Sequence, residues 1–267
     1  LSMAKKISLK FNDFIKIKNY CKKKKIGFLS TPFDLKSVKF LKKLNMDYFK
    51  IPSGEITNLP YLESVAKTKK RIILSTGMSN LKEVKDALKI LLKSGAKKKK
   101  ITILQCNTEY PTPLKDANIK AMLTLKKNCL TEVGYSDHTE GIDASLAAVS
   151  LGASIIEKHI TLNKNFHGPD HKASLSGDEF KKMVQSIRNI EVALGKGIKK
   201  VSSSEKKNIV VARNSIVALE NINKGQKFTK KNLTTKRPGN GISPIKFSTI
   251  LGRKAKKDFV EDEIIKV

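Results

Sequence analysis

Residues 71–106 read RIILSTGMSNLKEVKDALKILLKSGAKKKKITILQC. The apolar run at 71–75 is followed by small polar residues, and Val84, Leu88 and Leu91 then recur at helical spacing before a second apolar run at 101–106. A strand, an amphipathic helix and a second strand at this spacing are typical of parallel strands joined by a crossover helix. The stretch therefore predicts one β/α unit of a parallel sheet.

The same pattern occurs six times along the chain. The apolar runs are IGFLS (26–30), DYFKI (47–51), RIILS (71–75), ITILQC (101–106), TEVGYS (131–136) and SIIEKH (154–159). Polar residues follow nearly every run, as expected where a site lies at the carboxyl ends of parallel strands. Neither GxGxxG nor GxxxxGK[ST] follows any run, which disfavours the nucleotide-binding open sheets. The predicted fold class is therefore α/β, with a (β/α)8 TIM barrel as the favoured architecture.

A closed barrel of this type has eight units, and the sequence shows six. The chain opens with a predicted helix at 8–23, which Asn12 or Asp13 could cap. We therefore expect a barrel that lacks its first two β/α units. The alternative is an error in the count of strands.

The sequence changes character after Gly197. Residues 199–207 are polar, and the short strand-like pieces SIVALENI and ILGRKAKKDFV follow, with turns between them. The predicted domains are a partial barrel at 1–200, a linker at 201–209 and a small β-rich domain at 210–267.

The charge of the chain is strongly positive, with a formal net charge of +30 over 267 residues. Only five of the 54 basic residues are arginine and tryptophan is absent, whereas nucleic-acid-binding proteins commonly read bases with arginine and stack them on aromatic rings. We therefore expect no nucleic-acid partner, and a solvated lysine surface whose field attracts small anions.

The cysteines and the apolar segments bear on location. Cys21, Cys106 and Cys129 show no paired or metal-type spacing, which suits a reducing compartment. No apolar run approaches the roughly 20 residues of a membrane span, and the first residues have no signal-peptide core. We expect a cytoplasmic protein with no membrane partner.

All four histidines lie between Ser136 and His171. His138 and His159 each end a predicted strand in neighbouring units, so their imidazoles should lie on one rim. Two imidazoles with open positions suit a divalent metal that acts as a Lewis acid, and local hydrogen bonding is the alternative. His171 and Asp170 belong to a GPDH loop, and His167 has no assigned role.

Further polar residues follow the predicted strands. Lys50 within an apolar strand points to an anionic ligand, or alternatively to an ion pair with Glu157 or Glu132. Thr31 and Ser75 begin loops, where hydroxyl and backbone N–H groups can hold phosphate or carboxylate or can cap a helix. Cys106 is interpreted as an inert core thiol. Asn107 and Tyr110 are the better candidates for substrate contacts.

A set of motifs resembles one known family. FLSTPFD, FKIPSGE, ILSTGMS, LQCNTEYPTP, GYSDHTEG, IIEKHIT and GPDHKASL occur in the order found in the sialic acid synthases, and VARNSIVA with KRPGNGISP resembles their antifreeze-like (SAF) domain. The resemblance implies a (β/α)8 barrel with a SAF domain in a domain-swapped homodimer. It also implies condensation of phosphoenolpyruvate with an N-acylated amino sugar, N-acetylmannosamine or a 2,4-diacetamido-2,4,6-trideoxyhexose, to a nonulosonic acid and phosphate.

The resemblance also assigns residues. It implies Mn²⁺ or Mg²⁺ at His138 and His159, and a catalytic-site glutamate at Glu55. The residues that match the phosphoenolpyruvate site are Thr31, Lys50, Ser53, Ser75 and Ser136, with Lys50 also in the catalytic set. Asp170 matches a sugar contact beside Asn107 and Tyr110, and Arg237 matches an arginine that reaches the partner subunit's site.

Two expectations qualify this reading. Nothing here matches the glutamate and the lysine that the family carries on its first two strands, so we expect the chain alone to be inactive or very weak. The alternative is a protein that binds sugar or polyanions without turnover. Within the enzyme class, CNTEYPTP is closer to the diacetamido, legionaminate-type branch.

Overall fold

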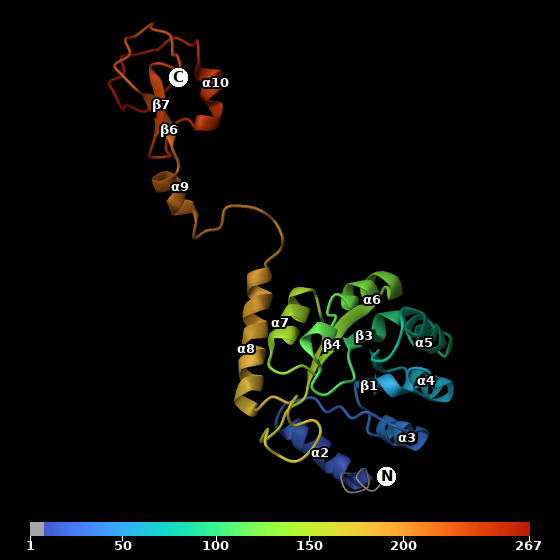
Figure 1. Ribbon diagram of the computed structural model, residues 1–267. Coiled ribbons are helices and arrows are strands. Elements are labelled where there is room, and N and C mark those ends of the chain that lie inside the picture. The colour runs from blue at the N-terminus through green and yellow to red at the C-terminus, as the bar shows by residue number, and fades with distance from the viewer. Residues whose placement is uncertain (1–7) are drawn as a thin grey trace. The chain divides into compact units, whose positions relative to one another are not determined.

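The computed structural model describes residues 8–267, and the chain divides into two compact units. The first unit ends at Gly195 and the second runs Lys196–Val267. The first carries a parallel sheet with its helices, and the second carries a small antiparallel pair of strands (Figure 1). Within residues 8–267 no helix combines the length and the apolar character needed to cross a bilayer.

The first unit is built on five parallel strands in the order β1-β2-β3-β4-β5. They are β1 (Tyr48–Ile51), β2 (Arg71–Ser75), β3 (Ile101–Cys106), β4 (Glu132–Asp137) and β5 (Ile156–Lys158). Each strand pairs with its sequence neighbour, and a helix connects each to the next. The α/β class with a parallel sheet is therefore confirmed.

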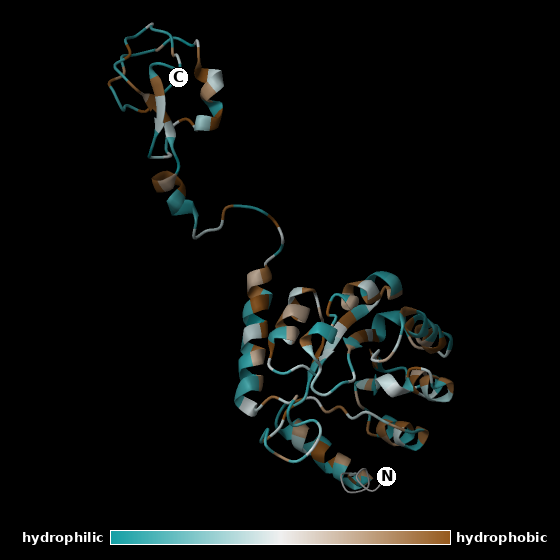
Figure 2. Ribbon diagram, in the orientation of Figure 1, coloured by the Kyte–Doolittle hydropathy of each residue, from teal (hydrophilic) through white to brown (hydrophobic). Residues whose placement is uncertain are grey.

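Helices surround the outer side of this sheet (Figure 1). They are α3 (Leu35–Lys43), α4 (Leu59–Ala66), α5 (Leu81–Lys93), α6 (Ala121–Cys129), α7 (Asp143–Ser150) and α8 (Gly177–Leu194). Helix α2 (Phe11–Lys23) adds no residue to the core of the sheet and stacks Phe11 on Phe40 of α3. Local sequence explains their starts: Asn80 and Glu83 form a reciprocal capping box on α5, and Asp13 accepts a hydrogen bond from the Lys10 N–H at the start of α2. Hydrophobic and hydrophilic residues are interspersed along α8 (Figure 2).

The two faces of the sheet differ in chemistry because side chains alternate along each strand. The face toward the helices carries the apolar core, with Phe49, Ile51, Ile72, Leu74, Ile101, Ile103, Val133 and Tyr135 packed against helix residues. The opposite face carries Lys50, Ser75, Cys106, Ser136 and Glu157, as the register of the paired strands requires. The polar groups therefore share the inner face.

One contact shows that the sheet is strongly curved. Lys50 lies on β1 and Glu157 on β5, the two edge strands, yet Lys50 Nζ lies 2.8 Å from Glu157 Oε1. In a flat sheet four strand spacings of about 4.8 Å would separate these strands by about 19 Å, beyond the reach of the two side chains. The inner face therefore closes around its polar residues, as in part of a barrel.

The first expected strand is wrong. Residues 26–30 belong to neither sheet, and β1 pairs only with β2. Ile26 and Leu29 are exposed, and Phe28 alone of the run packs partly against the core. An apolar run becomes a strand only where a neighbouring chain accepts its backbone hydrogen bonds, and the described residues offer this run no such neighbour. Within the described residues the parallel sheet thus has five strands in place of the six expected, and the loss of the first two β/α units stays a prediction.

The second unit has its own small core. It contains α9 (Lys206–Ala212), β6 (Ser215–Ala218), β7 (Leu233–Lys236) and α10 (Phe247–Ile250), and β6 pairs antiparallel with β7. The expected strand at ILGRKAKKDFV is reduced to isolated bridges at Lys254 and Phe259. Helix α9 begins inside the segment 201–209 that the sequence assigns to a linker.

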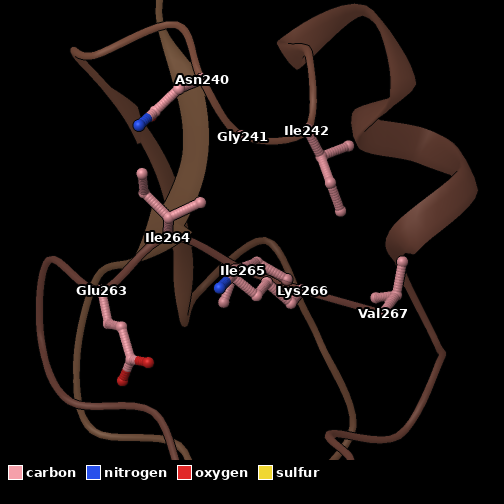
Figure 3. A pocket seen from close by; sticks show the side chains of 8 residues that line it. All are labelled: Asn240, Gly241, Ile242, Glu263, Ile264, Ile265, Lys266 and Val267. Atoms are coloured by element: carbon pink, nitrogen blue, oxygen red, sulfur yellow. The ribbon is translucent and has the colours of Figure 1, made fainter.

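A hollow of about 720 Å³ lies within this second unit (Figure 3). Its lining is formed by Asn240, Gly241, Ile242, Glu263, Ile264, Ile265, Lys266 and Val267. Much of the lining is aliphatic, and the hollow contains none of the histidines. None of the residues predicted for the site lines it.

Candidate functional site

Two histidines meet at the carboxyl ends of adjacent strands. His138 directly follows β4 and His159 directly follows β5. Their ring centroids lie 5.4 Å apart with an interplanar angle of 80°. The ring of Tyr110 packs against both, at 4.0 Å from His138 and 5.3 Å from His159. The structure therefore brings these three predicted residues together.

The orientation of His138 is set by a backbone carbonyl. His138 Nδ1 lies 2.5 Å from the carbonyl oxygen of Asn107, which can only accept, so Nδ1 carries the proton and donates. Burial lowers the pKa of His138 and favours its neutral form. A neutral imidazole with a protonated Nδ1 keeps its Nε2 lone pair free. That is the form in which histidine binds a metal ion.

The donor set fits a metal held by few protein ligands. His159 Nδ1 lies 3.8 Å from Asp170 Oδ2, so a carboxylate faces the second imidazole. Within residues 8–267 no group of three or more His, Cys, Asp or Glu side chains is placed to hold an ion. The described chain thus offers two imidazoles as its candidate ligands.

A chain of polar contacts runs across the inner face from β1 to His138. Glu157 Oε1 accepts from Lys50 Nζ at 2.8 Å and from Ser136 Oγ at 2.6 Å, and Ser136 Oγ lies 3.4 Å from His138 Nε2. The ion-pair interpretation of Lys50 is therefore confirmed with Glu157. Sequence reasoning considered Glu157 only as that partner and missed that it joins Lys50 to the serine beside the histidines.

Two predicted serines lie beside this chain. Ser53 Oγ accepts a hydrogen bond from the N–H of Gly77 at 2.9 Å and lies 3.4 Å from Cys106 Sγ. A Cβ at Gly77 would lie 2.9 Å from Ser53 Oγ, so this close approach requires glycine. Ser75 is buried, and its Oγ has no hydrogen-bond partner among the described residues. An unpaired buried hydroxyl on the inner face is a free contact for a ligand.

Other predicted residues are placed differently. Thr31 precedes α3 and lines a separate hollow of about 730 Å³. Glu55, in the short helix that follows β1, accepts from the Asn58 amide at 2.6 Å. The Asn107 side chain accepts from the Glu109 N–H, so its carbonyl, rather than its side chain, serves His138.

The GPDH loop forms its own pocket beside His159. This pocket of about 500 Å³ is lined by His159, Ile160, His167, Gly168, Pro169, Asp170, His171 and Ser174. His171 Nδ1 is 2.8 Å from Thr161 Oγ1, which holds the loop. Burial raises the pKa of Tyr110 to about 12, so its phenol stays protonated near neutral pH. The loop and Tyr110 thus flank His159 with the Asp170 carboxylate and a protonated phenol.

A family model, described as the NeuB family, matches residues 1–199, about three quarters of the 267 residues. The chain belongs to the NeuB family. A second model, the SAF domain, matches residues 213–266 of this NeuB chain. Arg237 lies within the SAF match, directly after β7, and is exposed. The expected membership of the sialic acid synthase family with a C-terminal SAF domain is thus confirmed.

Named relatives share most of the NeuB chain. It is 54% identical to an N,N'-diacetyllegionaminic acid synthase of Campylobacter jejuni, over 100% of this chain and 80% of that protein. It is 38% identical to a pseudaminic acid synthase of the same species, over 89% and 68%. A solved N-acetylneuraminic acid (sialic acid) synthetase of Leptospira borgpetersenii, in complex with citrate, is 35% identical with a TM-score of 0.71 over 76% of this chain and 70% of that one.

Proposed function

We propose that this NeuB chain condenses phosphoenolpyruvate with an N-acylated amino sugar to give a nonulosonic acid and phosphate. The observation that carries the proposal is the line of contacts from Lys50 through Glu157 and Ser136 to His138, with His159 beside it. It places a cation and hydroxyl groups next to a pair of imidazoles inside a curved sheet. The names of the relatives support the same reaction class.

Phosphoenolpyruvate would bind to the inner face near β1 and β2. Its carboxylate and phosphate need cations and hydrogen-bond donors, and Lys50, Ser53, Ser75 and Ser136 offer them. Lys50 forms an ion pair with Glu157, so bound phosphoenolpyruvate would replace the Glu157 carboxylate as the anionic partner of Lys50. Thr31, which the family resemblance adds to this set, lines a separate hollow. The positive net charge favours the approach of such an anion.

His138 and His159 would hold the divalent metal, Mn²⁺ or Mg²⁺. When bound there, the metal supplies Lewis-acid polarisation of the sugar aldehyde oxygen. The Asn107 carbonyl keeps His138 in the tautomer that this role requires. Asp170 faces His159 and would fix the ring on the other side.

The bond changes then follow from the substrate chemistry. C3 of phosphoenolpyruvate attacks the aldehyde carbon of the open-chain sugar, forming the new C–C bond and leaving a cation at C2. Water adds to C2, and phosphate leaves by cleavage of the C2–O bond. Lys50 and the serine hydroxyls stabilise the carboxylate and the departing phosphate. Glu55 is proposed as the acid–base group that takes a proton from the attacking water and gives one to the aldehyde oxygen.

The sugar would lie toward the GPDH loop and Tyr110. Asn107, Tyr110 and Asp170 would contact it, and Arg237 of the partner chain would reach its N-acyl group in a domain-swapped homodimer. The identity of 54% to a diacetyllegionaminic acid synthase, against 35% to the solved N-acetylneuraminic acid synthetase, favours a 2,4-diacetamido-2,4,6-trideoxyhexose over N-acetylmannosamine. The free thiols of Cys21, Cys106 and Cys129 are consistent with a cytoplasmic enzyme.

We also propose that the five strands are part of a (β/α)8 barrel. In an eight-stranded barrel the first and fifth of five consecutive strands lie opposite each other across the interior. The contact between Lys50 and Glu157 supports that arrangement. Three further strands would be needed to close such a barrel.

The reaction is tested with purified chain, phosphoenolpyruvate, Mn²⁺ and each of the two sugars. Phosphate should appear only when all three components are present, and faster with the diacetamido sugar, although slowly, because nothing in the chain matches the glutamate and the lysine of the family's first two strands. Calorimetric titration of phosphoenolpyruvate provides a reading independent of turnover, and Lys50→Met should weaken that binding at least tenfold. Binding of phosphoenolpyruvate that is unchanged by Lys50→Met would exclude this site.

A further inference from the structure

A buried ion pair lies behind the two histidines. Asp137, the last residue of β4, and Lys158, the last residue of β5, are register partners. Asp137 Oδ2 lies 3.1 Å from Lys158 Nζ, and both side chains are 0% exposed. No other ion pair within residues 8–267 has both side chains fully buried. The pair therefore needs an explanation of its own.

The charges of this pair are satisfied by the loop and helix that follow β4. Asp137 Oδ1 accepts from the N–H and the hydroxyl of Thr139, at 2.9 and 2.7 Å, and Oδ2 accepts from Ser145 of α7 at 2.6 Å. Lys158 Nζ also donates to the carbonyl of Thr139. The network thus links β4, its loop, α7 and β5, with His138 lying between two of its members.

Alternation along the strands places this network and the imidazoles on opposite faces. Asp137 and Lys158 directly precede His138 and His159, so the ion pair holds the two backbones at the positions from which the rings project. The ring of His138 is fixed at Nδ1 by the Asn107 carbonyl, and its own backbone carbonyl accepts from the Thr112 N–H. The pair supplies the remaining constraint, the spacing between the two strand ends.

Energetics argue against stability as the reason for the pair. Burying two charges costs several kcal/mol per ion, and well-packed apolar residues usually serve as well or better. What apolar packing lacks is direction, because an ion pair with hydrogen bonds fixes both the register and the rotation of the chains that carry it. Directional support is what two metal ligands on separate strands require.

We propose that the Asp137–Lys158 pair is a positioning unit that sets the separation and orientation of His138 and His159 for a divalent metal. This inference rests on the proposed function, because it assumes that the two imidazoles bind that metal. Neither Asp137 nor Lys158 contacts substrate or metal, and both act through the backbone of the residue that follows.

The test is the affinity for Mn²⁺, measured by electron paramagnetic resonance of the free ion in a titration of the whole chain. Lys158→Met should raise the dissociation constant by about 10- to 100-fold, the range seen when the support of metal ligands is removed. Ser145→Ala removes one hydrogen bond to Asp137 and should raise it about two- to fivefold. Alanine is compatible with helix α7, so this second variant should fold even where Lys158→Met does not.

Matched controls separate positioning from a general loss of structure. Ser150→Ala lies in the same helix, where the carbonyl of Leu146 is the one partner of Ser150 Oγ among the described residues, and it should leave Mn²⁺ affinity unchanged. Phosphoenolpyruvate affinity, measured without metal, should stay within about twofold in Lys158→Met if the Lys50 side of the site is intact.

The outcomes distinguish the inference from the proposed function. Wild-type binding of Mn²⁺ together with unchanged affinity in folded Lys158→Met, or in Ser145→Ala if the former is unfolded, overturns the positioning role alone. Absence of Mn²⁺ binding in the wild-type chain overturns the metal role of the histidines and the inference with it. A loss of affinity that is equal in Ser145→Ala and Ser150→Ala also contradicts the inference.

Discussion

The contact between Lys50 and Glu157 gives the sharpest test of the fold. It joins the two edge strands of the sheet across its inner face at 2.8 Å. A double-mutant cycle with Lys50→Met, Glu157→Gln and the double variant measures the coupling between them. Glutamine keeps the acceptor for Ser136, so the cycle isolates the charge pair.

The expected coupling follows from Coulomb's law. At 2.8 Å two unit charges interact by about 1.5 kcal/mol in bulk water and by about 6 kcal/mol at an effective dielectric constant of about 20. The side chains are 15% and 28% exposed, so water screens the pair in part. We expect a coupling free energy of about 2 kcal/mol, nearer the lower limit.

The assay is urea unfolding of the four proteins, followed by circular dichroism at 222 nm. The matched control is the pair Lys82–Asp86 on α5, which has a similar distance of 3.0 Å but side chains that are 86% and 56% exposed. Its coupling should be about 0.3–0.5 kcal/mol. The difference between the two cycles reports the enclosure of the inner face.

One result would refute this reasoning. Coupling below about 0.5 kcal/mol for Lys50 and Glu157, equal to that of the surface control, would mean that the two edge strands do not face each other in solution. The curved sheet and the barrel proposal would then both fail.

Three further predictions concern the site. Gly77→Ala places a Cβ 2.6 Å from a neighbouring side-chain carbon and should lower the free energy of unfolding by about 1–3 kcal/mol in urea titrations. Gly54→Ala has open space around its Cβ and should change the free energy of unfolding by less than about 1 kcal/mol. Equal effects of the two substitutions would contradict the close packing at Gly77. Burial raises the pKa of Tyr110 from 10.0 to about 12, so its phenol binds a proton more tightly in the folded chain, and the resulting stability is complete below pH 10 and lost as the pH rises toward 12. The thermal unfolding temperature of Tyr110→Phe should therefore fall less steeply than that of wild type as the pH rises from 10 to 12. Equal slopes for the two proteins would disprove the pKa shift. His138→Ala should abolish Mn²⁺ binding in calorimetric titrations while His167→Ala retains it, and retention by both variants would remove the metal site.

Local pattern was sufficient for most of the sheet. The strands at 71–75 and 101–106 coincide with their apolar runs, because each run is bounded by charged and small polar residues. The run at 26–30 has the same local pattern without being a strand, because strand formation depends on a partner that the run itself does not encode. Composition near the run therefore cannot decide whether a ladder forms.

The candidate site was likewise predictable only in part. His138, His159 and Tyr110 were identifiable because each follows a predicted strand, and parallel strands bring their carboxyl ends together. Glu157 contacts Lys50 across the whole sheet, a contact that depends on curvature, which no local pattern reports.

The buried pair was also beyond sequence reasoning. Asp137 and Lys158 have charged side chains that would ordinarily be assigned to solvent, and only the register of β4 with β5 shows them as partners.

The central claim is the condensation itself, and its most direct measurement is release of phosphate from phosphoenolpyruvate. With Mn²⁺ and a 2,4-diacetamido-2,4,6-trideoxyhexose present, phosphate and a nonulosonic acid should form in equal amounts, and omission of either the sugar or the metal should stop both. Phosphate release that is independent of the sugar, or no release and no binding of phosphoenolpyruvate, would contradict the account.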